Sequence, residues 1–236
     1  MKKTIITLLA ASACAMGATT LQDGVQFTDA TYTAPSTWSE AGLSVTLLLD
    51  VTKFAELFDD ATSSARPVFV SMSGTGSTIV GLEAHEDDRI TGASGVTAGG
   101  TYNNLYTLSS GNGDSISSII WGNVEAAALT MALETSSKGT YWSLTVLNSD
   151  GTYSSTYAGL ASFRWSAMGD ITKVAVDTDV VTTAYAFDGH YQGDAAYALN
   201  KAAIVASLPA PSVPEPATAT LSLLALAGLA ARRRRK

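Results

Sequence analysis

The sequence predicts an all-β fold, an antiparallel β-sandwich, between an N-terminal signal peptide and a C-terminal transmembrane helix. Short apolar stretches alternate with Gly, Asn, Asp and Ser turns from about residue 19 to 208. The 236-residue chain is 46% hydrophobic and only 15% charged, against roughly 25% charged in an average soluble domain. This composition excludes a disordered acidic tail and a coiled coil.

The strands are predicted from alternation and from the turns between them. Leu43–Leu49 begins with strict alternation and ends fully apolar, as a buried strand would. Residues 67–72 and 77–83 flank a Gly74-Thr75-Gly76 turn and form a predicted hairpin. Residues 124–134 fit a strand or a helix by periodicity, and their surroundings favour a strand. Further strands are predicted at 161–165, 171–176 and 180–187.

The clearest hairpin lies at residues 140–157. Trp142, Leu144 and Val146 alternate with polar neighbours at period two, which places the three on one face of a half-buried strand. Asp150-Gly151 can adopt the positive φ of a tight turn. The sequence therefore predicts Trp142 as a core residue.

Two helices are predicted in the same body. Val51–Asp60 places Val51, Phe54 and Phe58 at one-turn spacing, and residues 195–208 repeat this spacing before Pro209. No repeat of 20–50 residues and no change of composition divides the body. Residues 19–208 are therefore predicted to form one domain.

Charge is distributed unevenly along the chain. Seven of the 14 Lys and Arg residues lie at the two ends, whereas 20 of the 21 Asp and Glu residues lie within residues 19–208. The body therefore carries a large negative charge that would repel phosphate groups. A nucleic-acid partner is excluded.

Residues 1–18 have the three parts of a secretory signal peptide. Lys2 and Lys3 precede a short apolar run, and small residues between Ala15 and Ala18 provide cleavage sites. The expected partners are the Sec machinery and signal peptidase. Cys14, the single cysteine, leaves with the signal peptide in this interpretation. The alternative is a lipoprotein site with Cys14 acylated.

The C-terminal end has a second three-part pattern. Residues 209–216 form a Pro-rich linker that contains Pro214, Glu215 and Pro216. Residues 217–231 are an apolar run, about 22 Å long as a helix. The run precedes a cytoplasmic tail that stops transfer through the membrane, formed by Arg232, Arg233, Arg234, Arg235 and Lys236.

This end resembles the PEP-CTERM sorting signal of Gram-negative bacteria. The resemblance implies that an exosortase, a membrane enzyme with a cysteine nucleophile, cuts near Pro214-Glu215-Pro216. The chain would be the substrate of that reaction. It would be exported, anchored in the inner membrane by the C-terminal helix, and then transferred to the cell surface or released.

The end of the body is similar to laminin-G-like jelly-roll domains. Those domains close with a strand, a Phe-x-Gly turn and a short helix. Phe187-Asp188-Gly189, residues 197–199 and Ile204 agree with this pattern, while Ala203 stands where an acidic residue is usual. The resemblance implies a concanavalin A-like jelly roll.

Motifs for catalysis or metal binding are not found in the sequence. Residues 83–88 gather four carboxylates around His85, but without the spacing of a calcium loop or a zinc site. We interpret this stretch as a solvated loop beside Arg89. His190 lies in a Gly-flanked turn and is interpreted as a surface residue. No metal or cofactor is expected.

Glycosidase and hydrolase signatures are likewise missing from the sequence. A Glu-x-Asp-x-x-Glu strand and a Gly-x-Ser-x-Gly elbow do not occur. Trp38 and Trp121 have polar neighbours and are the candidates for stacking against sugar rings. The sequence thus favours a non-catalytic surface protein that binds glycans or has a structural role. The alternative is a surface glycoside hydrolase on the same sandwich.

Overall fold

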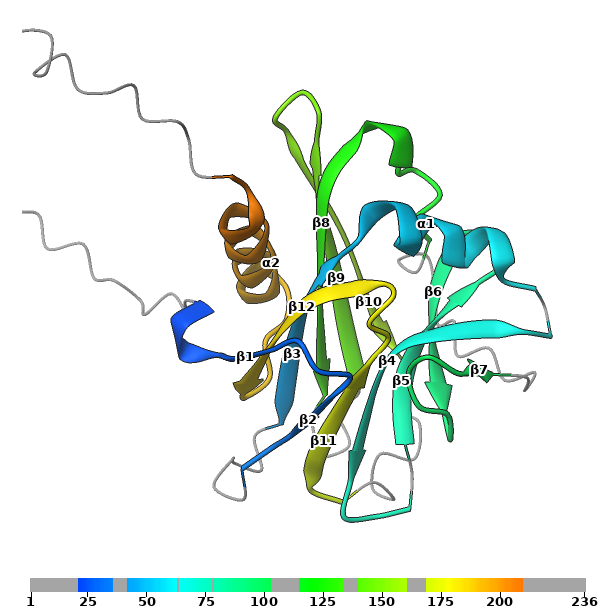
Figure 1. Cartoon of the computed structure of the whole chain (residues 1–236), viewed down its shortest axis with the longest axis vertical. Coiled ribbons are helices and arrows are strands. Elements are labelled where there is room, and N and C mark those ends of the chain that lie inside the picture. Colours follow the sequence, from blue (N-terminus) through cyan, green and yellow to red (C-terminus); the bar gives the residue numbers. More distant parts are fainter. Residues whose placement is uncertain are drawn as a thin grey trace, which may run out of the picture. The chain divides into compact units, whose positions relative to one another are not determined.

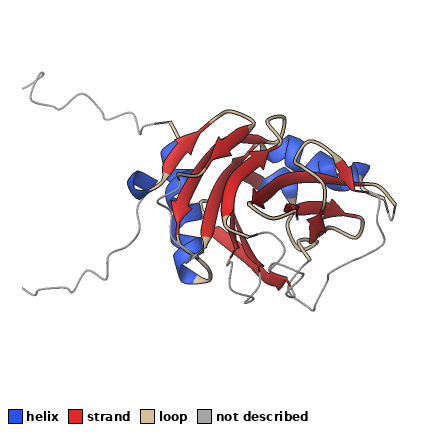
Figure 2. Cartoon of the chain, turned by 90° about the horizontal axis from the view of Figure 1, so that it is seen from below, coloured by secondary structure: helices blue, strands red, loops and turns tan. Residues whose placement is uncertain are grey.

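The computed structural model describes residues 21–35, 42–62, 64–77, 79–102, 115–133, 140–160 and 169–209. Two antiparallel sheets face each other across the core, as the sequence predicts (Figures 1 and 2). The predicted strand 161–165 and the predicted signal peptide, linker, membrane helix and basic tail lie outside the described residues, apart from Pro209.

The first sheet, called sheet A here, has the strand order β1-β12-β3-β8-β9-β10. Its strands are β1 (Val25–Phe27), β3 (Leu43–Leu49), β8 (Val124–Leu133), β9 (Thr140–Asn148), β10 (Tyr153–Leu160) and β12 (Val181–Asp188).

The second sheet, sheet B, has the order β2-β11-β4-β5-β6, and a short strand β7 pairs with the start of β4. Its strands are β2 (Thr31–Thr33), β4 (Arg66–Gly74), β5 (Ile79–His85), β6 (Arg89–Ser94), β7 (Thr101–Tyr102) and β11 (Ile171–Val176).

The core between the sheets is built from the alternating residues that the sequence marks. Trp142, Leu144 and Val146 of β9 are buried there, together with Val45 and Leu47 of β3. The prediction for Trp142 is therefore confirmed. Burial of such side chains is the main favourable contribution to folding.

Within the described ranges, two helices accompany the sheets, and two short 3₁₀ turns (η1, Leu21–Asp23; η2, Trp121–Asn123) precede β1 and β8. Helix α1 (Val51–Asp60) has the predicted bounds and begins at Asp50, whose side chain accepts a hydrogen bond from the Lys53 backbone N–H. Its buried Phe54 contacts Phe69 of β4 edge to face, with ring centroids 5.2 Å apart.

Helix α2 (Asp194–Ser207) packs on the outer face of sheet A, where Ala203 and Ile204 contact Ala126 and Ala128 of β8. The inner residues of β8, such as Leu129, belong to the core. Strand β8 is therefore covered on both faces, which explains why its sequence is mostly apolar and does not alternate clearly.

The acidic stretch 83–88 differs from the expected solvated loop. Glu83 and His85 are buried in β5, and only the following residues turn the chain into β6. Glu83 accepts hydrogen bonds from Arg66 of β4 and Thr91 of β6, which compensate part of the cost of burying its charge. The sequence interpretation was wrong here because these partners come from two other strands.

Candidate functional site

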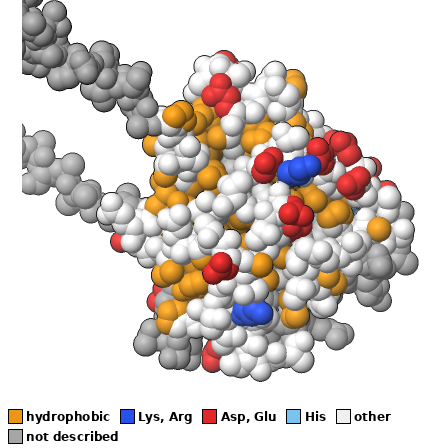
Figure 3. Space-filling model, in the orientation of Figure 1, with side chains coloured by type: hydrophobic (Ala, Val, Ile, Leu, Met, Phe, Trp, Pro, Cys, Tyr) orange, Lys and Arg blue, Asp and Glu red, His pale blue; other side chains and the backbone are white. Residues whose placement is uncertain are grey.

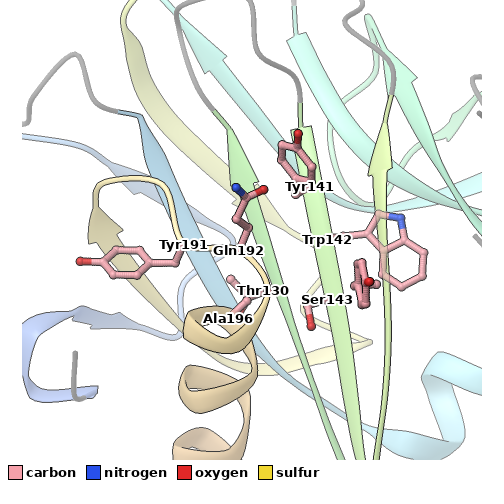
Figure 4. A pocket seen from close by; sticks show the side chains of 9 residues that line it. Thr130, Tyr141, Trp142, Ser143, Tyr191, Gln192 and Ala196 are labelled. Atoms are coloured by element: carbon pink, nitrogen blue, oxygen red, sulfur yellow. The ribbon is translucent and has the colours of Figure 1, made fainter. Parts of the chain in front are cut away.

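An open pocket of about 330 Å³ lies on the outer face of sheet A, beside the N-terminal end of α2 (Figure 4). Strands β8, β9 and β10 form its floor, and the loop that enters α2 forms one wall. Nine residues line it: Thr130, Tyr141, Trp142, Ser143, Tyr157, Tyr191, Gln192, Gly193 and Ala196. We call it the tyrosine pocket.

The register of the strands places two tyrosines on the same side of the sheet. Tyr157 of β10 lies opposite Ser143 of β9, and Tyr141 lies two residues before Ser143. Side chains two residues apart on a strand share a face, so Tyr141 and Tyr157 are diagonal neighbours across the pair. Trp142, between them in the sequence, points into the core.

Tyr157 is the exposed aromatic group of the pocket. Its exposed fraction is 68%, which is unusually high for a large side chain on a sheet. Tyr141 is half-buried, and its ring contacts His190 edge to face with a centroid distance of 5.4 Å. One ring is thus held by a neighbour while the other remains open to solvent.

The loop before α2 forms the opposite wall. Ser44 fixes this loop, because its hydroxyl donates to the Gly189 carbonyl and accepts from the Tyr191 N–H, both at 2.8 Å. The Tyr191 ring packs against Phe187 at 5.8 Å and points away from Tyr141 in Figure 4. The exposed Gln192 lies on the side of Tyr141 and supplies an amide to the pocket.

The described residues that line the tyrosine pocket carry no charge. They combine aromatic rings with five hydroxyl groups, three of them on tyrosines, and one amide, and they include no carboxylate, histidine or cationic side chain. Outside the pocket, Asp and Glu are more widespread than Lys and Arg on the face drawn in Figure 3. Such a lining can stack against and hydrogen-bond a neutral polar molecule.

A second open pocket, of about 430 Å³, lies beside the β9–β10 hairpin and is lined mostly by polar groups, including Asn123, Asn148 and Ser154. Asp150 carries the single carboxylate among its described lining residues. Hydrogen bonds from the Thr152 hydroxyl and N–H lower the pKa of Asp150, so this group stays ionised and does not suit a general acid.

The structure places the residues singled out by the sequence as follows. Trp121 is half-buried in η2, with its ring 5.5 Å from that of Phe54, and it does not line the tyrosine pocket. His190 is half-buried beside Tyr141, and His85 is buried with its ring Nδ1 against the Glu86 carbonyl. Trp38, Pro214, Glu215, Pro216 and residues 232–236 lie outside the described residues.

Sequence reasoning did not identify the tyrosine pocket. The alternation that predicts Trp142 in the core also predicts that Tyr141 lies on the opposite, outer face of the sheet. This was the sequence feature from which part of the pocket could have been predicted. The loop wall could not be inferred because Tyr191 and Gln192 are more than forty residues from the end of β9 in the sequence.

No group of three or more His, Cys, Asp or Glu side chains that could hold a metal ion is found within the described ranges. Among the helices that the structure describes, none is long and apolar enough to cross a membrane. The predicted membrane helix, residues 217–231, is outside these ranges.

Comparison with known proteins identifies the C-terminal end. No curated protein matches the chain. Residues 212–236 match the model of the PEP-CTERM protein-sorting motif. This motif implies an exported protein that exosortase processes and sorts to the cell surface, and the chain therefore carries a PEP-CTERM sorting signal behind a β-sandwich body.

Proposed function

We propose that the β-sandwich is a non-catalytic carbohydrate-binding module of a protein that exosortase sorts to the cell surface. The observation that carries this proposal is the tyrosine pocket, which presents Tyr157 and Tyr141 beside Ser143 and Gln192 and has no charged group among its described lining residues. Sugar rings have apolar C–H faces that suit aromatic side chains and hydroxyl groups that suit polar ones.

The negative charge of the protein favours neutral sugars over acidic sugars as ligands. The chain has a net charge of −7, and exposed Asp194 follows directly after the pocket residue Gly193. Acidic sugars would be repelled at this site, so neutral sugars are the expected ligands. The pocket volume, about 330 Å³, is near the lower end of the range for small-molecule sites, which is about 300–1,000 Å³.

The jelly-roll interpretation belongs to the same proposal. Strand β12 pairs with β3 and strand β11 pairs with β4. In both sheets, a strand from the C-terminal part of the body therefore lies next to a strand from its N-terminal part. Strand β12 is followed by α2, in the order of the laminin-G-like pattern. These features support a concanavalin A-like jelly roll.

The alternative, a surface glycoside hydrolase, requires two carboxyl groups on either side of a sugar bond, about 5–9 Å apart. Among the described residues that line them, the tyrosine pocket has no carboxyl group, and the second pocket, beside the β9–β10 hairpin, has only that of Asp150. The chemistry of both linings therefore favours binding over hydrolysis.

A glycan array probed with the full chain in a mild detergent tests the proposal, with a reducing-sugar assay run on the glycans that bind. We expect binding of neutral glycans without release of reducing ends. Tyr157→Ala should weaken this binding at least tenfold, which corresponds to about 1.4 kcal/mol, because it removes the exposed ring.

Tyr197→Ala is the matched control, because Tyr197 is a partly exposed tyrosine of α2 that does not line the pocket. Equal losses in the two variants would contradict a site at Tyr157. Release of reducing ends by the wild-type chain would favour the hydrolase.

A further inference from the structure

Strand β10 ends sheet A, and within the part of the chain that the structure describes no strand pairs with its other side. Its eight residues, Tyr153–Leu160, include no charged residue and no proline. Proteins usually protect such an edge with a charge, a proline or a very short strand. The end strands β1 and β2 have three residues each, and β6 begins with Arg89. Among the edge strands that the structure describes, β10 is therefore the long and uncharged one.

The hydrogen-bond ladder shows which backbone groups β10 presents to this open side. The Asn148 N–H donates to the Thr152 carbonyl at 2.8 Å, so these opposed residues form a hydrogen-bonded pair. Such pairs alternate along an antiparallel ladder. Residues 154, 156, 158 and 160 therefore bond to β9, and the N–H and C=O groups of Tyr153, Ser155, Tyr157 and Gly159 point to the open side.

We propose that β10 pairs with β10 of a second copy of this chain, antiparallel and with the two-fold axis at Thr156. The four outward residues are spaced symmetrically about Thr156. In this register Tyr153 lies opposite Gly159 of the second copy, and Ser155 lies opposite Tyr157 of the second copy. Every outward N–H and C=O then has a partner, and the two copies of sheet A form one continuous sheet.

The chemistry of the strand favours a second copy as the occupant. The chain has a net charge of −7, but no charge lies on β10 to repel its own copy across the axis. A shift of the register by two residues would leave outward groups unpaired in both copies. A shift by one residue would place residues whose N–H and C=O groups point to the open side opposite residues whose groups point to β9. The symmetric register is therefore the one that satisfies the edge completely.

Disulfide cross-linking tests this register directly. On the axis, Thr156 faces Thr156 of the second copy in a non-hydrogen-bonded pair, where Cα atoms are about 4.5 Å apart. This separation lies within the range for a disulfide, about 4.4–6.8 Å. The test uses the full chain with Cys14→Ala, which removes the single native thiol. The PEP-CTERM motif implies an exported chain, and expression with export into an oxidising compartment allows the disulfide to form.

We expect Thr156→Cys to form a disulfide-linked dimer on a non-reducing gel, and reductant should convert it to monomer. Ser154→Cys is the matched control. Ser154 would lie opposite Ala158 of the second copy and about 13 Å along the strand from its own counterpart, so this variant should remain monomeric. A protease-resistant, exported Thr156→Cys chain that stays monomeric would overturn the proposal, and so would equal cross-linking of both variants.

A backbone substitution tests the pairing independently of cysteine chemistry. Ser155→Pro removes an N–H that points to the open side, where proline is compatible with an edge strand. Ser155→Ala removes the same hydroxyl, which lies 3.0 Å from the Thr145 hydroxyl, but keeps the N–H. In the Thr156→Cys chain, Ser155→Pro should reduce the dimer at least fivefold and Ser155→Ala should not. Equal dimer in both variants would overturn the proposal, whatever the outcome of the glycan experiments.

Discussion

Asn200 of α2 accepts a hydrogen bond from Thr130 of β8, with 2.7 Å between Thr130 Oγ1 and Asn200 Oδ1. Both side chains are buried, and Thr130 Oγ1 also lies 2.8 Å from the hydroxyl of Thr46 on β3. Because Thr130 donates its proton to Asn200, Thr46 must donate to Thr130. A chain of polar groups therefore crosses the face of sheet A beneath the helix.

The amide nitrogen of Asn200 completes this network on β9. It donates to the Ser143 carbonyl at 2.7 Å and to the Thr145 hydroxyl at 3.2 Å. One side chain thus connects α2 to two strands of sheet A and to the backbone of Ser143, which lines the tyrosine pocket. We infer that Asn200 sets the position of the helix on the sheet.

Asn200→Ala should lower the free energy of unfolding by about 2 to 4 kcal/mol, because it leaves buried donors and acceptors without partners. Urea denaturation of residues 19–208 measures this loss. Val205→Ala is the control on the same helix, since Val205 is 56% exposed. Its effect should be within about 0.5 kcal/mol. Similar losses in the two variants would mean that the network contributes little.

Glu83 gives the stability of the body a pH dependence. Burial raises the pKa of Glu83, while hydrogen bonds from Thr91 and Arg66 act in the opposite direction without cancelling it. In the pH range between the ordinary pKa of a glutamic acid and this raised pKa, the folded protein binds more protons than the unfolded chain. Its contribution to stability therefore falls as the pH rises through this range.

Glu83→Gln should remove this pH dependence, because the amide keeps an acceptor for Thr91 but does not titrate. The free energy of unfolding, measured from pH 4 to pH 8 by urea denaturation, should fall less steeply with rising pH than in the wild type. Glu125→Gln, at an exposed position, is the control and should keep the wild-type slope. An unchanged slope in Glu83→Gln would show that Glu83 is not the responsible group.

The parts of the fold that were predicted from the sequence are those set by local pattern. Strand β3, residues 43–49, and helix α1, residues 51–60, have the predicted bounds because the sequence pattern changes at Asp50 from strand alternation to helical spacing. The short strands β1 and β2 were missed, since three residues carry too little pattern. Strand β6 was missed because the acidic stretch before it looked solvated, and Asp87 and Asp88 adopt positive φ in a tight turn there.

The candidate site was less predictable because it depends on contacts between distant segments. The sequence pointed to Trp38 and Trp121 as stacking residues, and their role stays a prediction. The tyrosine pocket instead combines strands β8 to β10 with the loop that Ser44 of β3 holds in place. The register between these segments follows from packing, which no single stretch of sequence encodes.

Gly81 of β5 permits the close approach of β4. A Cβ atom at Gly81 would lie 2.4 Å from the backbone carbonyl oxygen of Val70, and this oxygen cannot move without disturbing the β4–β5 ladder. Gly81→Ala should therefore lower the free energy of unfolding by about 2 to 3 kcal/mol, a cost typical of overpacking.

Gly122→Ala is the matched substitution, because a Cβ atom at Gly122 would meet nothing within 4 Å. Both substitutions add one methyl group to a glycine that does not adopt positive φ, so the effect on the unfolded chain is the same. Urea denaturation of both variants thus isolates the clash with Val70. If Gly81→Ala were as stable as Gly122→Ala, the two strands would have to be separable at this point, and the packing argument for β5 would be wrong.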